Sequence, residues 1–178
     1  MSSDDRQWLS YDVTFLEMLN APSFEISLLP PEKGIDLVKA KTPPVWYFLD
    51  LYKMVGSEYE WSDQFEVSQN DIKLFLEHTD VKFYTLIYQG WPGGFFILDY
   101  RQDRICDLAY FGLVKEVFGK GIGRYLLGQA VRLGWQRPGL KKMTVNTNTL
   151  DHEAALPLYK KFGFAEIRVE THLRLKTR

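Results

Sequence analysis

The sequence predicts an α/β domain of the α+β type, in which helices cover both faces of a mixed, mostly antiparallel sheet. Residues 82–114 support this class because they hold three successive segments rich in aromatic and β-branched residues, which favour strands. A glycine-rich loop at residues 118–123 then leads into an amphipathic helix. The rest of the chain alternates strand-like and helix-like segments, an order that packs helices against one sheet.

Length and composition narrow the class of protein. The chain has 178 residues, 46% of them hydrophobic and 25% charged, so it can bury a core without disulfides or metals. Its single cysteine, Cys106, cannot form an internal disulfide, which favours a reducing compartment. No apolar run approaches the roughly 18 residues of a membrane span, and the N-terminus lacks a signal-peptide pattern. We therefore expect a cytoplasmic protein without a membrane partner, either monomer or homodimer.

The N-terminal part is expected to contain few strands. The first twenty residues are polar with scattered apolar positions, which predicts a mobile tail or a short helix. Residues 24–29 and 35–40 look like short strands separated by prolines and a glycine. A helix should follow Pro44 and end at Gly56, since apolar residues recur there at helical spacing. A second helix at residues 72–76 follows three possible capping residues, Ser68, Asn70 and Asp71.

The C-terminal part has clearer signals. Residues 82–88, 95–100 and 105–114 should pair as an antiparallel meander because short turns connect them. The helix after the glycine loop has a periodic apolar face made of Ile122, Leu126, Ala130 and Leu133. A strand at residues 142–147 and a last strand at residues 165–175 flank a helix at 153–162, which Asp151 should cap and Gly163 should end.

Charge is distributed unevenly along the chain. Residues 1–113 hold 9 Lys/Arg and 18 Asp/Glu, whereas residues 114–178 hold 13 Lys/Arg and 5 Asp/Glu. This split fits an anionic ligand in the C-terminal half and a cationic one in the N-terminal half, although chance accounts for it equally well. The sequence pI of about 6.3 argues against a nucleic-acid partner.

The glycine loop predicts an anion site. The N–H groups in the first turn of a helix have no intrahelical partners, and glycine lets a phosphate approach the backbone closely. The loop reads Gly119, Lys120, Gly121, Ile122, Gly123, Arg124. It lacks the spacing of a P-loop, and Arg124 stands where a dinucleotide-binding loop needs its third glycine.

Two segments together carry a family resemblance: DLAYFGLVKEVFGKGIGRYLL, ending at residue 127, and TLDHEAALPLYKKFGF, ending at residue 164. They resemble the acetyl-CoA-binding core of the GNAT N-acetyltransferases, and the resemblance covers residues 82–166. It implies the acyl-CoA N-acyltransferase fold as one domain over 1–178, with an acceptor side at 1–80 and a core at 81–178. It also implies acetyl-CoA as co-substrate, no metal, and direct transfer to a primary amine in a ternary complex. A CoA-binding module without turnover is the alternative.

The resemblance also implies the cofactor contacts. These are Leu113, Val114, Phe118, Gly119, Lys120, Gly121, Ile122, Gly123, Arg124, Asn148 and His152. Family members usually have Gln or Arg where this chain has Phe118, so cofactor binding should be weakened but not abolished. His152 either holds CoA, relays a proton or is a surface residue. Gly112 suggests a bulge or the close approach of the pantetheine arm.

Acetyl transfer to an amine needs a base, an oxyanion donor and an acid. Asp107 is the candidate base, because a carboxylate in an apolar strand is costly unless it is useful; the alternative is a solvated residue at the start of a strand. The resemblance implies an oxyanion donor among the backbone N–H groups at the strand end, residues 111–114, and identifies Tyr159 as the acid. A phenol with a pKa near about 10 suits protonation of a leaving thiolate, unless Tyr159 is only a core residue.

The acceptor side is expected around Tyr52, Trp61 and Asp63. Aromatic faces and carboxylates together attract ammonium groups, so we expect a cationic acceptor with some apolar body. Glu58 and Glu60 add negative charge to the same segment. The alternative is that the aromatic residues are core and the acids face solvent.

Overall fold

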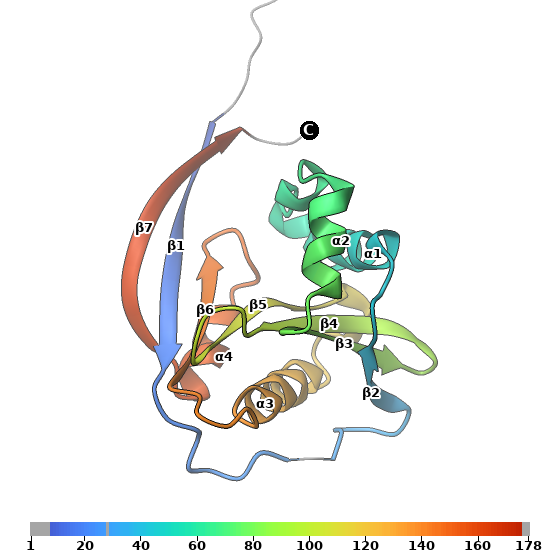
Figure 1. The fold of residues 1–178 in the computed structure, drawn as a ribbon, viewed down its shortest axis with the longest axis vertical. Coiled ribbons are helices and arrows are strands. Elements are labelled where there is room, and N and C mark those ends of the chain that lie inside the picture. The colour runs from blue at the N-terminus through green and yellow to red at the C-terminus, as the bar shows by residue number, and fades with distance from the viewer. Residues whose placement is uncertain (1–7, 28, 176–178) are drawn as a thin grey trace, which may run out of the picture.

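The computed structural model describes residues 8–27 and 29–175, which form one seven-stranded sheet in the order β2-β3-β4-β5-β6-β1-β7 (Figure 1). The strands are β1 Trp8–Met18, β2 Ile35–Ala40, β3 Val81–Tyr88, β4 Trp91–Asp99, β5 Ile105–Leu113, β6 Lys142–Asn148 and β7 Ala165–Leu175. Neighbouring strands pair antiparallel except β5 and β6, which are parallel. The predicted fold class is therefore confirmed.

The two faces of the sheet are covered by different helices. Figure 1 shows α1 and α2 on one face and α3 and α4 on the other. Their bounds are α1 Val45–Gly56, α2 Gln69–Glu77, α3 Ile122–Gly134 and α4 Ala155–Lys161, with short 3-10 turns η1 Ser57–Tyr59, η2 Asp63–Phe65 and η3 Lys115–Val117. None of the helices in the described part of the chain is long and apolar enough to cross a membrane.

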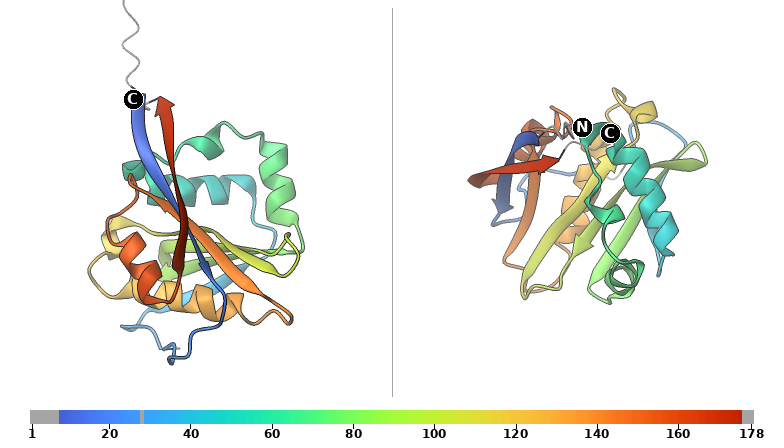
Figure 2. Two further views of the ribbon diagram at one scale, coloured as in Figure 1. Left: turned by 90° about the vertical axis from the view of Figure 1, so that its left-hand side faces the viewer. Right: turned by 90° about the horizontal axis from the view of Figure 1, so that it is seen from above.

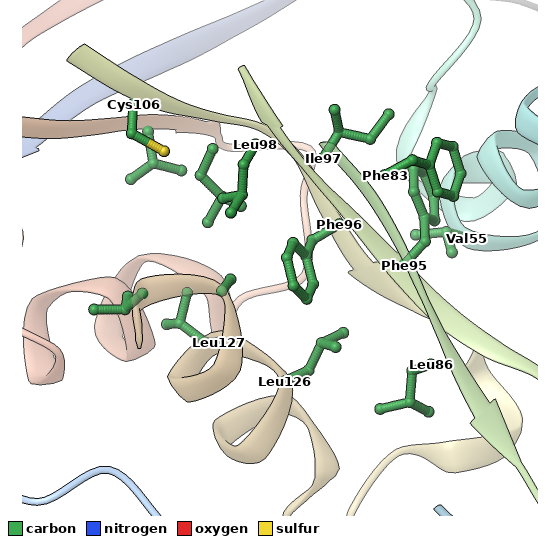
Figure 3. Close-up of a cluster of buried hydrophobic side chains, with 14 of the residues drawn as sticks. Val55, Phe83, Leu86, Phe95, Phe96, Ile97, Leu98, Cys106, Leu126 and Leu127 are labelled. Carbon is green, nitrogen blue, oxygen red and sulfur yellow. The ribbon is translucent and has the colours of Figure 1, made fainter. Parts of the chain in front are cut away.

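The core lies on both faces of β4, where residues 93–98 are all buried. Successive side chains of a strand point to opposite faces, and Figure 3 shows Phe96 pointing toward Leu126 and Leu127 of α3, whereas Phe95 points toward Val55 of α1. Burial on both faces explains why this strand is apolar throughout rather than alternating. It also makes β4 a rigid support for β5, which carries part of the cleft described below.

The prediction for the first twenty residues was wrong. Residues 1–7 lie outside the described residues, but Trp8–Met18 form β1, which is inserted between β6 and β7. Figure 2 shows β1 and β7 running side by side. Residues 9–15 alternate between apolar and polar side chains, a strand signal that the prediction overlooked. Both partners of β1 come from the C-terminal part of the chain, so its place in the sheet depends on distant segments.

The strand expected at residues 24–29 is also wrong in the described part of that range, which excludes Leu28. The segment crosses α3 and α4 as irregular chain instead. Gln129 on α3 donates to the Ser27 carbonyl oxygen at 2.9 Å, and the Phe24 ring lies 5.7 Å from that of Phe162. The segment therefore lies on the helices through single contacts, with Phe24 exposed and Ile26 half-buried.

The remaining expectations need smaller changes. The strand at 35–40, the two N-terminal helices and the meander are confirmed, and Ser68 is the cap of α2, accepting from the Asp71 N–H at 3.1 Å. Strand β4 begins at Trp91, earlier than expected, and α4 begins at Ala155 rather than 153. Asp151 does not cap α4, because its carboxylate accepts from other groups.

The parallel strands β5 and β6 pair only at their beginnings. Residues 105–107 pair with residues 142–144, and β5 continues along β4 as far as Leu113 without a partner on its other side among the described residues. A register shift between Ile97 and Leu98 leaves Ala109 as an extra residue in β5, a β-bulge that bends the strand. The two strands therefore diverge beyond Asp107, and the gap between them opens a path through the sheet.

Candidate functional site

A cleft of about 450 Å³ occupies the gap between β5 and β6. Its walls come from β1, the α1–η2 segment, β5, the glycine loop, the β6–α4 turn and β7. The cleft thus joins the glycine loop on the α3 side of the sheet to the aromatic residues that follow α1. One cavity reaches both of the regions that the sequence predicts to bind ligands.

The glycine loop has the backbone that an anion site needs. Gly119 and Gly121 have φ of 75° and 74°, a region that side chains disfavour, and Gly121 precedes the first turn of α3. A Cβ added at Gly119 would meet nothing within 4 Å, and one at Gly121 only Pro31 at 3.9 Å. The outer face of the loop is therefore open, and no acidic residue stands in the first turn of α3. Backbone N–H groups and the helix dipole favour a phosphate there.

Most of the predicted cofactor residues line the cleft. They are Leu113, Phe118, Gly119, Gly121, Ile122, Gly123, Asn148 and His152. Because the Val114 N–H donates to the Gly93 carbonyl oxygen of β4, the preceding N–H at Leu113 points to the other edge of the strand, toward the cleft. Leu113 can therefore offer a backbone donor to a ligand.

Three predicted cofactor residues lie outside the cleft wall. Val114 is buried, and its N–H is already used. The Lys120 ammonium donates to the Tyr88 hydroxyl and lies 4.4 Å from the centre of that ring. Arg124 is exposed on the first turn of α3. Their contribution to cofactor binding stays a prediction. For Lys120 and Arg124 it requires that their long side chains reach the cofactor.

Phe118 and His152 meet across the cleft. Their ring centres are 5.0 Å apart in an edge-to-face arrangement, and the Tyr59 ring lies 6.2 Å from His152 on its other side. The His152 Nδ1 accepts from the Ala154 N–H at 3.1 Å, so Nε2 is its remaining polar atom. Phe118 thus packs against the His152 ring and offers the cleft an apolar surface.

Tyr159 lies at the middle of the cleft wall. Its ring packs edge-to-face against Phe111 and Phe164, and the residue is buried. No residue in the described part of the chain forms a hydrogen bond with its hydroxyl. Burial, helped by the charge of Asp151, raises the pKa of Tyr159 well above its ordinary value. The hydroxyl therefore stays protonated and can donate a proton into the cleft.

Asp107 lies where β5 and β6 are still paired, at the base of the cleft and outside its wall. The Thr144 hydroxyl on β6 donates to Asp107 Oδ1 at 2.6 Å. Burial raises the pKa of Asp107, the bond from Thr144 lowers it, and the charge of Asp99 on β4 raises it, with a net rise. This is the direction that a general base near neutral pH needs. Reaching an amine in the cleft would require a bridging water.

Asp151 joins the two sides of the cleft. Its Oδ2 accepts from the Thr147 hydroxyl at 2.8 Å and from the Asn148 N–H at 2.9 Å, both on β6. Its Oδ1 accepts from the Trp61 indole N–H at 2.9 Å. The carboxylate thereby ties the segment after α1 to the turn before α4, although the two are ninety residues apart.

Tyr52, Trp61 and Asp63 all line the cleft, as predicted for the acceptor side. The Tyr52 and Trp61 ring centres are 5.2 Å apart, and burial raises the pKa of Tyr52 to about 12. Asp63 is paired with Arg174 of β7, whose Nη2 donates to Asp63 Oδ1 at 2.6 Å and to Ser62 Oγ at 2.6 Å.

The other acids of this segment do not enter the cleft wall. Glu58 pairs with Lys115 at 3.0 Å on the surface. Of the carboxylates that do line the cleft, Asp63 faces a guanidinium and Asp151 accepts three hydrogen bonds. The cleft is therefore less anionic than the sequence suggests.

Residues 48–164 match the sequence pattern of the acetyltransferase (GNAT) family, which is more than half of the 178 residues. The chain belongs to the GNAT family. Among curated proteins, none matches its sequence.

Solved GNAT-like structures share the fold at low identity. A conserved protein of unknown function from Staphylococcus epidermidis superposes with a TM-score of 0.63 at 14% identity, over 93% of this chain and 62% of that one. A GCN5-related N-acetyltransferase from Kribbella flavida gives 0.61 at 12% identity, over 91% and 56%. An aminoglycoside acetyltransferase from an uncultured soil metagenomic sample gives 0.57 at 19%, over 72% and 90%. The chain thus spans only about 60% of the first two proteins.

GNAT acetyltransferases use acetyl-CoA as co-substrate, and the residues of this cleft fit that molecule. The glycine loop offers free backbone donors and an open face for a diphosphate. Beyond it, the unpaired edge of β5 offers the Leu113 N–H to an extended chain of amides, and Tyr159 lies further along the same cavity.

Sequence reasoning missed several residues of this GNAT cleft. Tyr11 and Val13 enter it from β1, and Arg174 enters it from β7. Arg174 alternates with apolar residues in an ordinary strand pattern, so nothing in the sequence marks it. The bulge expected at Gly112 is at Ala109, and the close neighbour of Gly112 is Val55 of α1, whose Cγ1 would lie 2.2 Å from an added Cβ.

Proposed function

We propose that the protein is an N-acetyltransferase that moves an acetyl group from acetyl-CoA to a primary amine by direct transfer in a ternary complex. The observation that carries the proposal is the single cleft that joins the glycine loop, Tyr159 and the aromatic residues after α1. Two molecules that enter from opposite faces of the sheet would meet in the gap between β5 and β6. Holding two reactants in this way replaces a bimolecular step by an effectively unimolecular one.

The cofactor half of the cleft binds through the backbone. Gly119, Gly121 and Gly123 bring N–H groups to the diphosphate, and Leu113 donates to the pantetheine arm. Asn148 and His152 flank the same arm from the β6–α4 turn, and Phe118 adds apolar contact. Bound acetyl-CoA supplies a thioester whose sulfur leaves as a thiolate.

The reaction requires three proton movements. Asp107 accepts the first proton, which the ammonium loses before attack, through a water held at the base of the cleft. The neutral amine nitrogen then forms a bond to the acetyl carbon, and the carbon–sulfur bond breaks with its electron pair on sulfur. Tyr159 gives a proton to sulfur, and the second proton that the nitrogen loses returns Tyr159 to its neutral form. The raised pKa of Asp107 suits its role, because Asp107 binds a proton more readily. The raised pKa of Tyr159 keeps its hydroxyl protonated before transfer but also makes it a weaker acid toward the thiolate, so its position in the cleft, and not its pKa, supports the role of acid. A backbone N–H near Phe111 stabilises the carbonyl oxygen.

The test is a thiol-release screen of the full chain with acetyl-CoA over a library of primary amines. Release that depends on an amine and yields the N-acetyl product supports the proposal. The same screen with Tyr159→Phe should show slower release with unchanged affinity for acetyl-CoA. Release without an amine would indicate hydrolysis and contradict direct transfer.

A CoA-binding protein without turnover is the second candidate. The position of Asp107 outside the cleft wall favours it, because no carboxylate then contacts the amine directly. This candidate predicts saturable acetyl-CoA binding by calorimetry together with no amine-dependent release in the screen. Any acetylated product from the wild-type chain, absent in Tyr159→Phe, would exclude it.

A further inference from the structure

The acceptor end of the cleft contains one basic side chain. Arg174 is the only Lys or Arg among the described residues that line the cavity. It projects from β7 toward the α1–η2 segment, where Tyr11, Tyr52 and Trp61 also line the wall. The ordinary role of Arg174 would be a structural ion pair with Asp63. Whether Arg174 can also bind a ligand depends on how many of its N–H groups this ion pair leaves free.

The guanidinium is incompletely paired. Only Nη2 is used, donating to Ser62 Oγ and Asp63 Oδ1. Nε and Nη1 form no hydrogen bond with any residue that the structure describes. A guanidinium has five N–H donors, so three of the five stay open on this account. The described residues contain no buried side-chain nitrogen or oxygen without a partner, so these open donors are accessible from the cavity that Arg174 lines.

The two partners of this ion pair differ in exposure to solvent. The Arg174 side chain is 16% exposed, whereas its partner Asp63 is 73% exposed. An ion pair with a solvated carboxylate contributes little to stability. Asp63 therefore compensates only part of the cost of removing the Arg174 charge from water. The positive charge is thus held inside the wall, and the negative charge is held at the rim.

The neighbouring surface is aromatic. Tyr52 and Tyr110 have ring centres 6.0 Å apart, and the Arg174 guanidinium lies 5.9 Å from the centre of the Tyr11 ring. The acidic groups that would attract a polycation are instead occupied: Asp151 accepts three hydrogen bonds, and Glu58 pairs with Lys115 outside the cleft. An apolar body beside a single anionic group fits this surface best.

We propose that the amine acceptor carries a carboxylate that binds the open N–H groups of Arg174, with its apolar or aromatic body against the tyrosines and Trp61. The acceptor class is thus an amino acid, which replaces the cationic acceptor that the acidic N-terminal sequence suggests. The planar guanidinium matches a carboxylate with two parallel hydrogen bonds, which a lysine cannot reproduce. The inference rests on the proposed acetyltransferase function and deepens it.

The experiment compares three amines that share one body: L-phenylalanine, L-phenylalaninamide and 2-phenylethylamine. Thiol release is measured with each for the wild type and for Arg174→Gln. The wild type should prefer phenylalanine at least tenfold in kcat/KM. Arg174→Gln should raise KM for phenylalanine at least tenfold and change kcat/KM for phenylethylamine less than threefold. Arg174→Lys should restore only part of the preference.

Two controls separate recognition from structure. Asp63→Asn removes the ion pair but keeps the guanidinium, so the preference for the carboxylate should persist or increase. The melting temperature of each variant shows whether β7 remains in place. A wild type that prefers phenylethylamine, or an Arg174→Gln variant that loses all three activities equally, would overturn the inference.

A binding measurement tests the Arg174 site even if the protein proves not to be an acetyltransferase. Should no amine be acetylated, calorimetry of L-phenylalanine with the wild type and Arg174→Gln in the presence of CoA still reports on the site. Binding that requires Arg174 would support the carboxylate site and leave the acetyltransferase proposal rejected. Acetylation of amines without any carboxylate preference would retain the acetyltransferase and reject the site.

Discussion

The two ends of the cleft are built in different ways. The cofactor end comes from one stretch of chain, residues 105–161, in which β5, α3, β6 and α4 follow one another. The acceptor end comes from three separate segments: β1, the end of α1 with the chain that follows it, and β7. The first end presents glycines and backbone N–H groups, and the second presents tyrosines, Trp61, Asp63 and Arg174.

This difference has a functional consequence. Backbone donors do not depend on residue type, so we expect Phe118 to leave cofactor binding possible. We also expect the side chains of the acceptor end to define which amine fits, and polar contacts such as Trp61 with Asp151 hold them in place. We expect substitutions at the first end to alter acetyl-CoA binding for every acceptor and those at the second to alter acceptor choice.

The largest effect on the cofactor end is expected from Gly121→Val. A β-branched residue at φ 74° is strained, and its side chain would cover the N–H groups of the loop. Acetyl-CoA at a hundredfold over its dissociation constant should stabilise the wild type by about 2.7 kcal/mol, and the variant should lose this stabilisation. Thermal melting with and without acetyl-CoA measures it.

The matched control is Gly139→Val, which has a similar φ of 77° in a turn that does not line the cleft. It should melt at a lower temperature than the wild type but keep the full shift with acetyl-CoA. An undiminished shift in Gly121→Val would reject the assignment of the glycine loop.

Tyr159→Phe tests the point where the two ends meet. The change removes one hydroxyl that has no described partner, so folding should be almost unaffected. Loss of a general acid should lower kcat by about 100-fold while the affinity for acetyl-CoA changes less than twofold. Tyr84→Phe, on the opposite part of the sheet where Tyr84 stacks on Phe96, is the control and should retain full activity. An unchanged kcat in Tyr159→Phe would make Tyr159 a packing residue.

Asp107→Asn should change the pH dependence of both activity and stability. The base must be ionised, so wild-type kcat/KM should fall as pH drops through the raised pKa of Asp107. The variant should be about tenfold slower at pH 7 and closer to the wild type at pH 9, where more amine arrives neutral. Loss that is equal at every pH would indicate a positioning role.

The stability effect of Asp107→Asn has the opposite sign. A carboxyl whose pKa is raised by folding stabilises the native state below its unfolded pKa, and this contribution is lost as pH rises through the folded pKa. At pH 7 the wild type therefore holds an unfavourable buried charge, which the neutral amide of the variant removes. The melting temperature of the variant should match or exceed that of the wild type at pH 7. A clear decrease would mean that the carboxylate is stabilising.

Trp61→Phe should give the smallest effect and should be confined to the acceptor end. The substitution keeps the aromatic packing on Tyr52 but removes the hydrogen bond to Asp151. A net loss of about 1 kcal/mol corresponds to roughly fivefold in KM for the amine, with acetyl-CoA affinity unchanged. Equal weakening of both substrates would show that the two ends are not separable.

Local patterns in the sequence were enough to predict the elements of the cofactor end. The meander, the glycine loop, the amphipathic helix α3 and the strand–helix–strand that follows all carry local signals: periodicity, turn residues and glycine spacing. These signals also mark the glycine loop as an anion site, whereas the roles of Leu113 and Tyr159 are implied only by the resemblance to the GNAT family. Local patterns do not give the order of the strands in the sheet, since β7 follows β6 in the chain but pairs with β1.

The acceptor end could not be assembled from local patterns, because its segments are far apart in the chain. Strand β1 exists because β6 and β7 pair with it, as in the register of Val13 with Asn148 and Glu170, and these partners lie far away in the C-terminal part of the chain. That pairing places Tyr11 and Arg174 beside Asp63. The positive charge of Arg174 then offsets part of the negative charge that the sequence predicts for the acceptor end. Divergence of β5 from β6 likewise depends on pairing and on the bulge at Ala109. A local pattern can mark a strand, as the alternation over residues 9–15 does, but it does not say which distant segment pairs with that strand. The residues that we propose to distinguish one amine from another are brought together by such distant pairing.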